Sequence, residues 1–382
     1  MHSLYKSSRP VYLCDFIFQN NIPSRKILNA SDPRDLIFGL LDIISDKDDL
    51  DLYADYDMTV AEVFTRTTKS LFLTKNYRRR NYTLDCVVPV LETPADFPSW
   101  VPDWERIASR GLARYPINWH RRWYADRGMP DPANCETVEE DLYCLEKFSC
   151  VLGIITEIMQ PAKLTDSYSL GEGDDPDQII REAQERRRED IKARLSSIAE
   201  FAQLGGDCSA DDDHVWRTVS FGKTCTGVNP QELGKSSLVG QISVLLRRIA
   251  RNETIDAGAL TPLQIEFIRE AVSDMGSSED ILSSTQSCLK EVAETWCENI
   301  VVTLDRVLFK TTTGMLGLGY VSVKPRDVVT ILHDVKSPII LRPSADAASA
   351  GRFSFAGDAY IDHVMQGEFH ESKPEYQSFK IY

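Results

Sequence analysis

The spacing of apolar residues changes near residue 303, and this change constrains the fold more than any other feature of the sequence. In residues 176–204 and 237–303, apolar residues recur every three or four positions, which predicts helices that each bury one face. After residue 303, short apolar runs alternate with turn residues, which predicts strands. We therefore expect an α+β protein, with mainly helical N-terminal and central regions and a small antiparallel β-sheet or barrel at the C-terminus. The expected C-terminal strands are residues 307–311, 328–332, 339–341, 353–355 and 360–361.

Two further helices and one or two strands are expected before residue 160. Pro33 suits the first turn of a helix, where its missing N–H is no loss, and apolar residues continue at helical spacing to Ile44. Thr59 and Glu62 fit a capping box, in which a hydroxyl and a carboxylate satisfy free backbone donors at the start of a helix. Residues 141–160 are expected to form the strands.

The charge balance argues against nucleic acid as a partner. The chain has 43 Lys+Arg and 58 Asp+Glu, a net charge of −15, whereas a nucleic-acid surface needs concentrated positive charge. Residues 119–124 mix cations with aromatic rings, which fits either base stacking or a packed loop. The acidic balance favours the packed loop, so no nucleic-acid partner is expected.

The sequence shows neither a membrane span nor a secretion signal. No apolar run approaches the ~20 residues that cross a bilayer. The apolar stretch 11–18 is short and is interrupted by Asp15, unlike a signal peptide. The nine cysteines are odd in number and include no CxxC pair, which argues against a disulfide framework. These features predict a cytoplasmic protein.

No active site can be identified from residue patterns. The Gly-Lys-Thr at residues 222–224 resembles the end of a P-loop, but Arg217 stands where that motif needs glycine. Residues 314–319 are glycine-rich without the GxGxxG spacing, which predicts a turn rather than a dinucleotide site. No catalytic residue, cofactor or metal is therefore assigned. Four candidate metal ligands match no metal-site spacing and are expected in a solvated tail: His363, Glu368, His370 and Glu371.

A set of short blocks between Ala30 and Glu368 resembles the fungal heterokaryon incompatibility (HET) domain family. Residues 30–41 resemble the last conserved block of the HET domain, and residues 97–104 resemble the family's Leu-Pro-Ser-Trp-Val-Pro-Asp-Trp signature. Later blocks follow in the family's order, although Arg326 stands where glycine is usual. The residues that carry the resemblance are Asp32, Pro33, Arg34, Asp35, Pro98, Trp100, Pro102, Asp103, Trp104, Trp216, Arg217, Gly317, Gly319, Arg342, Pro343, Tyr360, Gly367 and Glu368.

The resemblance implies a chain that lacks part of the family's architecture. Family members begin with a TIR-like HET core, and two early blocks of that core have no counterpart in this sequence. The chain resembles a truncated paralogue, in which residues 1–45 hold the last helix of the core and residues 46–160 form a mixed helix and strand region. Residues 161–303 would form a helical region, and residues 304–382 a small β domain with a tail.

The function that the resemblance implies is a non-enzymatic regulatory or recognition module in fungal non-self recognition and programmed cell death. The expected partner is a full-length HET-family protein or a second copy of the chain. Two alternatives remain open, which are a NAD-cleaving enzyme of the TIR-like type and a truncated gene product without function.

The motif residues themselves are interpreted as architectural. Pro98 and Pro102 fix the backbone, and the neighbouring tryptophans can each bury about 150–250 Å². The alternative interpretation is a surface for self-recognition or partner binding.

Overall fold

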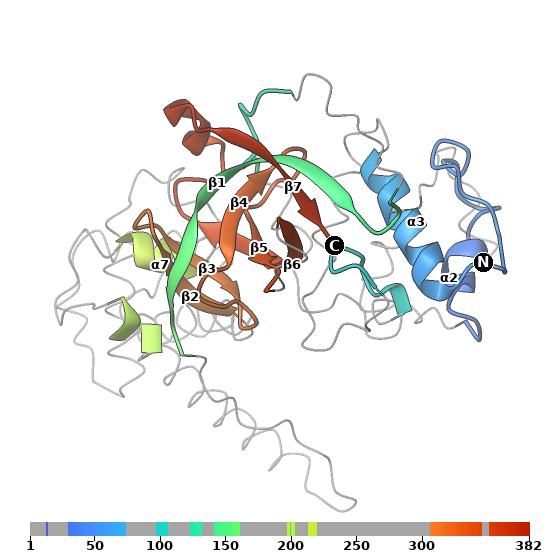
Figure 1. Cartoon of the computed structure of the whole chain (residues 1–382), viewed down its shortest axis with the longest axis horizontal. Helices are drawn as coiled ribbons and strands as arrows, with labels where there is room; N and C mark the ends of the chain where they lie inside the picture. The colour runs from blue at the N-terminus through green and yellow to red at the C-terminus, as the bar shows by residue number, and fades with distance from the viewer. Residues whose placement is uncertain are drawn as a thin grey trace, which may run out of the picture. The chain divides into compact units, whose positions relative to one another are not determined.

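Seven β-strands account for most of the regular structure in the residues that can be described (Figure 1). The computed structural model describes residues 13, 30–73, 97–105, 123–131, 141–160, 197–198, 200–202, 213–219, 306–345 and 351–382. In chain order, the elements are α2 (Asp35–Phe38), α3 (Val60–Leu73), β1 (Leu145–Ile158), α7 (Asp213–Val219), β2 (Arg306–Thr311), β3 (Leu316–Tyr320), β4 (Val328–Leu332), β5 (Ile339–Pro343), β6 (Arg352–Ile361), the 3₁₀ helix η7 (Glu368–Ser372) and β7 (Tyr376–Ile381).

The strands form one sheet with the hydrogen-bonded order β2-β3-β6-β5-β4-β1-β7. β1 also pairs with β2, and β6 also pairs with β7. Because β2 is the first strand in this order and β1 the next to last, the β1–β2 pairing closes the row of strands. The pairs β1–β4, β1–β7, β2–β3, β4–β5 and β5–β6 are antiparallel, whereas β6–β7 is parallel. The sheet is therefore mixed.

The expected fold class, mainly helical with a small antiparallel C-terminal sheet, is wrong. β1 is a 14-residue strand from the middle of the chain, and it pairs with both β4 and β7. The sheet therefore extends beyond the C-terminal strands that alternation revealed. The helix expected from Pro33 to Ile44 is a single α-helical turn, α2, because the amides of Leu40 and Leu41 bond three residues back rather than four. Most of the expected helical region 161–303 lies outside the described residues.

The capping box at the start of α3 is confirmed. The Glu62 carboxylate accepts a hydrogen bond from the Thr59 amide at 2.7 Å, and the Thr59 hydroxyl accepts one from the Glu62 amide at 3.2 Å. These two bonds satisfy backbone donors that have no partner inside the helix. α3 then buries the face that carries Val63, Phe64 and Leu71.

The alternation of apolar runs with turn residues located the buried C-terminal strands except β3 and β7. β2, β4 and β5 are confirmed, with small differences at their ends. The two short strands expected at residues 353–355 and 360–361 are instead one continuous strand, β6. The segment 314–319, expected as a turn, contains the start of β3; Gly314 forms the turn with a φ of 80°. The C-terminal segment, expected as a solvated tail, contains η7, the buried His370 and β7.

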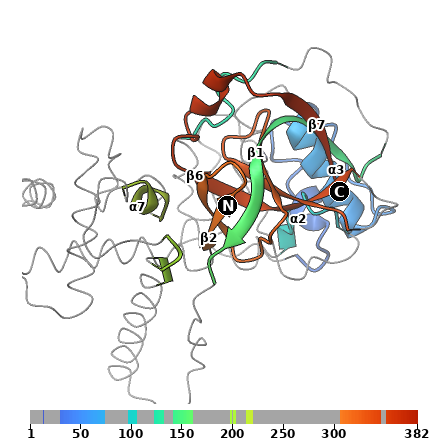
Figure 2. The same cartoon turned by 60° about the vertical axis from the view of Figure 1, so that its left-hand side comes forward.

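The chain divides into two compact units. The first consists of Met1–Ile155, Ser322–Ala359 and His363–Tyr382, and α2 and α3 lie side by side in it (Figures 1 and 2). Its apolar core joins these helices to residues 97–104 and to β1, β4, β5, β6 and β7. Among the most buried members of this core are Ile37, Phe64, Trp100, Leu332, Leu341 and Ile381.

The second unit consists of Thr156–Val321 and Tyr360–Asp362. β2 and β3 form a hairpin in which Arg306 lies opposite Tyr320, and the Arg306 guanidinium sits 4.2 Å from the Tyr320 ring centroid. α7 contacts β3, and the Met159 amide donates to the Leu308 carbonyl at 2.8 Å. The four-segment division expected from the sequence stays a prediction.

Candidate functional site

The Asp32–Arg34 motif fixes the segment that precedes α3. One edge of the Arg34 guanidinium donates to both Asp32 carboxylate oxygens, at 3.0 and 2.7 Å. Its remaining terminal nitrogen donates to the backbone carbonyls of Tyr56 at 2.6 Å and Met58 at 2.9 Å. These hydrogen bonds from Arg34 lower the pKa of the Asp32 carboxyl. The motif therefore ties residues 56–58 to the turn that contains Pro33.

Tyr56 is contacted by three residues around α2 and is still 55% exposed. Its hydroxyl donates to the Asp35 carboxylate at 2.6 Å, which raises the pKa of Tyr56. The Arg34 guanidinium lies 5.2 Å from the ring centroid, and the Phe38 ring meets it edge-on at 5.1 Å. Tyr56 is thus a protonated, fixed and exposed aromatic ring.

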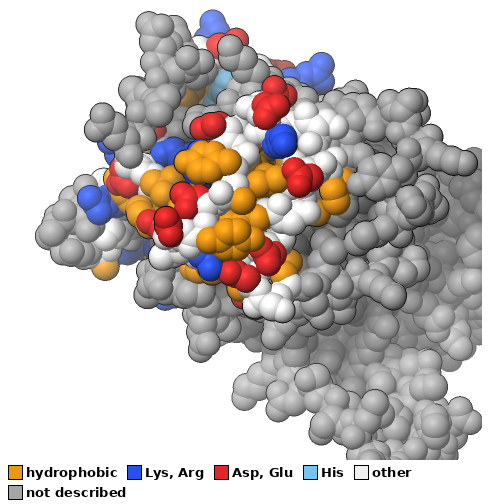
Figure 3. Space-filling view, turned by 90° about the vertical axis from the view of Figure 1, so that its right-hand side faces the viewer, with side chains coloured by type: hydrophobic (Ala, Val, Ile, Leu, Met, Phe, Trp, Pro, Cys, Tyr) orange, Lys and Arg blue, Asp and Glu red, His pale blue; other side chains and the backbone are white. Residues whose placement is uncertain are grey.

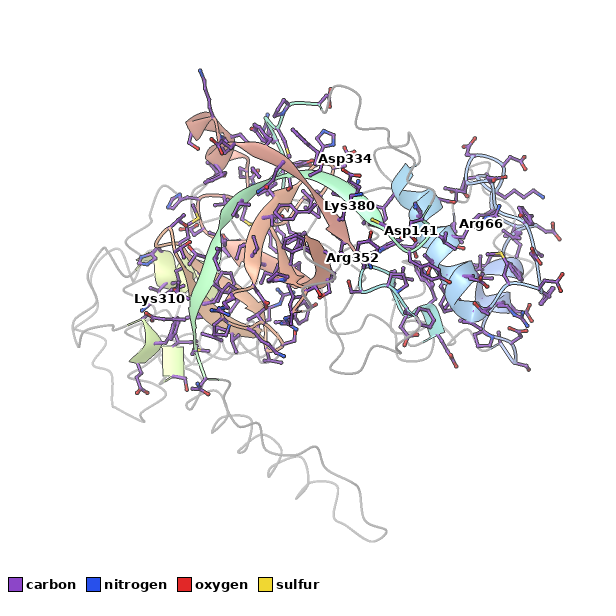
Figure 4. All side chains as sticks on the ribbon, viewed as in Figure 1. Arg66, Asp141, Lys310, Asp334, Arg352 and Lys380 are labelled. Carbon is purple, nitrogen blue, oxygen red and sulfur yellow. The ribbon has the colours of Figure 1, made fainter. Side chains whose placement is uncertain are left out.

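Tyr53 is held in a similar way by α3. The Arg66 guanidinium reaches from α3 to 4.0 Å from the Tyr53 ring centroid (Figure 4). The same guanidinium donates to the Asp51 carbonyl at 3.1 Å and to the Asp51 carboxylate at 3.3 Å. Tyr53 remains 53% exposed. Arg34, which directly precedes α2, and Arg66 of α3 therefore each support one exposed tyrosine.

An apolar hollow lies between the two helices and the segment that carries the tyrosines. Its interior volume is only about 10 Å³, which is room for about one water molecule. Tyr53 and Arg66 stand at this hollow together with an apolar lining. The apolar lining is Ile37, Phe38, Leu41, Leu52, Met58 and Val63.

The protein surface around the hollow is acidic. Between Asp42 and Asp57 the sequence has seven aspartates and one lysine. Five of these aspartates are exposed, and Figure 3 shows hydrophobic side chains on this face surrounded by acidic ones. Cations at this surface are already paired, Arg34 with Asp32, Lys47 with Asp42 and Arg66 with Asp51. We call the hollow, Tyr53, Tyr56 and the exposed aspartates of residues 42–57 the acidic aromatic face.

The Pro-Ser-Trp-Val-Pro-Asp-Trp block is part of the core. Trp100 is fully buried, meets Phe72 of α3 at 6.2 Å between ring centroids, and donates from its indole nitrogen to the Tyr143 carbonyl at 3.2 Å. The Ser99 hydroxyl donates to the Tyr382 carbonyl and accepts from the Phe355 amide at 2.7 Å. Pro98, Pro102 and Trp104 are also buried, and Asp103 is half-buried. Residues 98–104 therefore join α3 to β6 and to Tyr382.

Two C-terminal motif blocks meet in an ion pair. Asp327, which precedes β4, is 2% exposed and accepts two hydrogen bonds from Arg342 of β5, at 3.0 and 2.8 Å. Arg342 also donates to the Ser322 carbonyl at 2.7 Å. Pro343 follows at the exposed end of β5, opposite Phe353 of β6.

Two of the three motif glycines sit where a side chain has no room. A β-carbon on Gly317 of β3 would overlap the ring of Phe309, its partner on β2. Gly319 is buried opposite Val307. Gly367 has a φ of 92°, and a β-carbon there would overlap the Arg127 carbonyl. Gly317 and Gly367 are therefore close approaches, to a ring and to a backbone carbonyl, that favour glycine.

The remaining motif residues are also placed locally. Glu368 accepts a hydrogen bond from the Gln366 amide at 2.8 Å, and Tyr360 is buried in β6. Trp216 and Arg217 belong to α7, but their side chains lie outside what the structure describes. The candidate Gly-Lys-Thr at 222–224 also lies outside the described residues, as do residues 119–122.

The four candidate metal ligands near the C-terminus do not form a site. In the described part of the chain, no three His, Cys, Asp or Glu side chains are grouped to hold a metal ion. His370 instead donates from Nε2 to the Ala125 carbonyl at 3.0 Å, which leaves Nδ1 to accept from the Tyr376 hydroxyl at 3.1 Å. Burial lowers the pKa of His370, so the neutral ring is favoured.

Sequence reasoning missed the parts of the acidic aromatic face that depend on tertiary contact. Tyr53 and Arg66 belong to no motif, and their pairing joins a loop to a helix 13 positions away. The run of aspartates can be read in the sequence, but its association with exposed tyrosines depends on the fold. A second missed cluster surrounds Asp126, whose pKa burial and the nearby Asp334 raise to about 6.

Comparison with known proteins agrees with the family blocks. Residues 265–381, which include β2 to β7, match the family model described as the Het-6 beta-barrel domain. The chain is similar to "Heterokaryon incompatibility protein 6, OR allele" of Neurospora crassa, with 23% identity over 374 residues. That alignment covers 89% of this chain and 49% of the relative, so the chain spans about half the length of the curated relative it matches. No solved structure matches the chain.

The mixed sheet and the family match define a protein with a HET-type C-terminal β-barrel region. The resemblance to heterokaryon incompatibility proteins seen in the sequence blocks is confirmed by the match of residues 265–381 and by the similarity of 89% of the chain to the curated relative. Within the described residues, no helix combines the length and the hydropathy needed to cross a membrane.

Proposed function

We propose that this chain is a non-enzymatic recognition module in fungal non-self recognition and the programmed cell death that follows it, acting in the cytoplasm. Its partner would be a full-length HET-family protein or a second copy of itself. The observation that carries the proposal is a separation of roles between two sets of residues. Polar groups of the family motifs bind the chain's own backbone, while Tyr53 and Tyr56 are held exposed on an acidic surface.

The motif contacts favour architecture over catalysis. A catalytic side chain needs a reactive atom within reach of a substrate. Arg34, Trp100 and Arg342 instead direct their donors at backbone carbonyls of the chain itself. The family resemblance supports the biological setting, since the curated relative is named for heterokaryon incompatibility.

The test is the incompatibility reaction between fungal strains. Strains that differ only in expression of this chain are fused, and the survival of the fused cells is measured. We expect death or growth arrest that depends on the chain. Fused cells that survive equally with and without the chain would contradict a role in non-self recognition.

A second arm of the experiment tests the non-enzymatic part. The pure chain is incubated with NAD, and the NAD remaining is measured over time. The proposal expects no loss beyond that in buffer. If the wild-type chain consumed NAD, the chain would be a NAD-cleaving enzyme and not a non-enzymatic recognition module, whatever the result of the fusion assay.

A further inference from the structure

We propose that β7 is exchanged between two copies of this chain, so that β7 of one copy pairs with β1 and β6 of the other. The inference rests on the proposed function, because it makes a second copy the recognition partner and names the contact. It starts from Lys373, a residue with an unfavourable backbone conformation in the connection that leads into β7.

β7 lies against the rest of its unit as a bound peptide strand would (Figure 1). It pairs antiparallel with β1 over six residues and parallel with β6 at Arg352 and Phe353. Phe379 and Ile381 are buried in the core, and the Phe379 ring meets the Phe353 ring at 4.6 Å between centroids. A second copy has the same residues, so an exchanged β7 can form all of these contacts again.

The residue after β7 is anchored by the same neighbours. The Tyr382 amide donates to the Phe353 carbonyl at 2.8 Å, and the Tyr382 carbonyl accepts from the Ser99 amide at 3.1 Å. The Arg352 guanidinium lies 4.4 Å from the Tyr382 ring centroid. Main-chain hydrogen bonds and side-chain contacts of this kind are how a sheet binds an extended segment of another chain.

The connection into β7 is strained. Lys373 has a φ of 52° and a ψ of 60°, a left-handed conformation that residues with a side chain disfavour. Pro374 follows, and a proline restricts the residue before it to extended conformations. Of the five non-glycine residues with positive φ in the described ranges, Lys373 alone precedes a proline.

Exchange of β7 would remove this strain. If residues 373–375 extend to carry β7 to a second copy, Lys373 can adopt the extended conformation that Pro374 favours. Short connections under strain promote exchange of the element that follows them. Since the strand contacts are the same in both forms, the relief of strain at Lys373 is the difference that favours the dimer.

Charge and burial set the conditions for exchange. Each copy has a net charge of −15, so two copies repel each other until salt screens the charge. Phe379 and Ile381 are buried, so β7 can leave its own copy only by local opening of the fold. We therefore expect a dimer that forms slowly, at high protein concentration, and more readily as salt is added.

Dimer formation by the full chain is the test. The chain is incubated at high concentration with and without added salt, and its mass is followed by size-exclusion chromatography with light scattering. We expect a dimer that persists after dilution, because β7 must be released before the two copies separate. A chain that stays monomeric under all of these conditions would overturn the inference.

Lys373→Gly tests the role of strain. Glycine tolerates the left-handed conformation, and each dimer contains two such connections, so the association constant should fall by at least about tenfold. Arg326→Gly is the matched control, because it relieves a φ of 77° at a residue outside β7 and its connection. It should leave the association constant unchanged. An equal fall in both variants, or no fall for Lys373→Gly, would exclude strain at this connection as the cause.

A disulfide lock tests the exchange itself. Glu146 of β1 lies opposite Lys380 of β7, so Glu146→Cys with Lys380→Cys in one chain allows a disulfide that keeps β7 in its own copy. The double variant, oxidised while dilute, should stay monomeric when concentrated, and reduction should restore the dimer. Melting curves show whether the variant is folded. If the oxidised variant dimerises as well as the wild type, the copies associate through another surface and the proposal fails.

The fusion assay separates this inference from the proposed function. A chain that stays monomeric but still causes the incompatibility reaction would reject strand exchange and leave the proposed function standing. A chain that exchanges β7 but causes no incompatibility reaction would confirm the exchange and contradict the proposed function.

Discussion

Asp327 and Arg342 form a bidentate ion pair that joins two of the family's C-terminal blocks, with Arg342 nitrogens 3.0 and 2.8 Å from the Asp327 carboxylate oxygens. Asp327 is almost completely buried, and its second oxygen also accepts from the Lys324 amide at 2.7 Å. The pair therefore fixes the turn before β4 against β5. Two family blocks that are separate in the sequence therefore meet in one contact of this fold.

Removing the arginine should leave a buried carboxylate without its charge partner. We expect Arg342→Met to lower the free energy of unfolding by about 3 kcal/mol, since an unpaired buried charge is strongly destabilising. Denaturant unfolding measures the change. Arg352→Met is the control, because Arg352 is exposed on β6 and stacks on Tyr382; it should cost less than about 1 kcal/mol. Two results would contradict this account. One is a loss of stability for Arg342→Met that is no larger than the loss for Arg352→Met. The other is that Asp327→Asn, added to Arg342→Met, restores none of the lost stability.

Arg326 occupies a backbone conformation that favours glycine. Its φ is 77°, and glycine is usual at this position of the family block. The side chain is exposed, so little packing is lost on substitution. We expect Arg326→Gly to raise the free energy of unfolding by about 0.5–1 kcal/mol through relief of the left-handed strain. Arg326→Ala, which keeps the β-carbon, should give no such gain, and a less stable glycine variant would show that the strain argument is wrong.

Gly317 leaves room for the ring of Phe309 across the β2–β3 hairpin. An added methyl group would overlap that ring, and Phe309 is fully buried, so the ring has little space to move. We expect Gly317→Ala to lower the free energy of unfolding by about 2 kcal/mol. A double-mutant cycle with Phe309→Leu isolates the overlap, because the smaller side chain should recover part of the loss. If the losses of stability from the two substitutions are strictly additive, an overlap between a β-carbon at position 317 and the Phe309 ring is excluded.

Asp126 predicts a pH dependence of stability. Burial and the neighbouring Asp334 raise the pKa of Asp126 to about 6, while His333 and Lys336 oppose that shift. The folded state therefore holds a proton that the unfolded state releases near pH 4, so this contribution to stability is present below pH 4 and is lost as pH rises through 6. Asp126→Asn should raise the free energy of unfolding at pH 7.5 by about 1–2 kcal/mol.

Melting curves at several pH values check this prediction. The difference between Asp126→Asn and the wild type should shrink as pH falls from 7 to 4. Asp48→Asn, at an exposed position, serves as the control and should show no comparable pH-dependent difference. A difference that stays constant with pH would show that Asp126 titrates normally in the folded protein.

The sequence revealed those parts of the fold that depend on residues close together in the chain. The capping box at Thr59 and Glu62 depends on residues three positions apart, so the pattern alone located the start of α3. The buried strands β4 and β5 are nearly continuous apolar runs and were visible for the same reason. Helical spacing from Pro33 to Ile44 was a weaker guide, because tertiary packing buried the same residues in turns.

Long-range pairing was the part that the sequence did not reveal. β7 alternates Phe379 and Ile381 inward with polar residues outward, a strand signal that its position near the end of the chain obscured. The place of β1 beside β4 and β7 depends on partners more than 170 residues away, which no local pattern encodes. The acidic aromatic face likewise depends on two cations that contact the same loop, Arg34, which precedes α2, and Arg66 of α3.

The measurement that tests the central claim most directly is binding of this chain to a full-length HET-family protein from the same cells. The two purified proteins are mixed at micromolar concentration, and complex formation is followed by analytical ultracentrifugation. The account predicts a complex that Tyr53→Ala with Tyr56→Ala weakens and Tyr143→Ala does not. The absence of any complex, or a complex indifferent to both tyrosines, would contradict it.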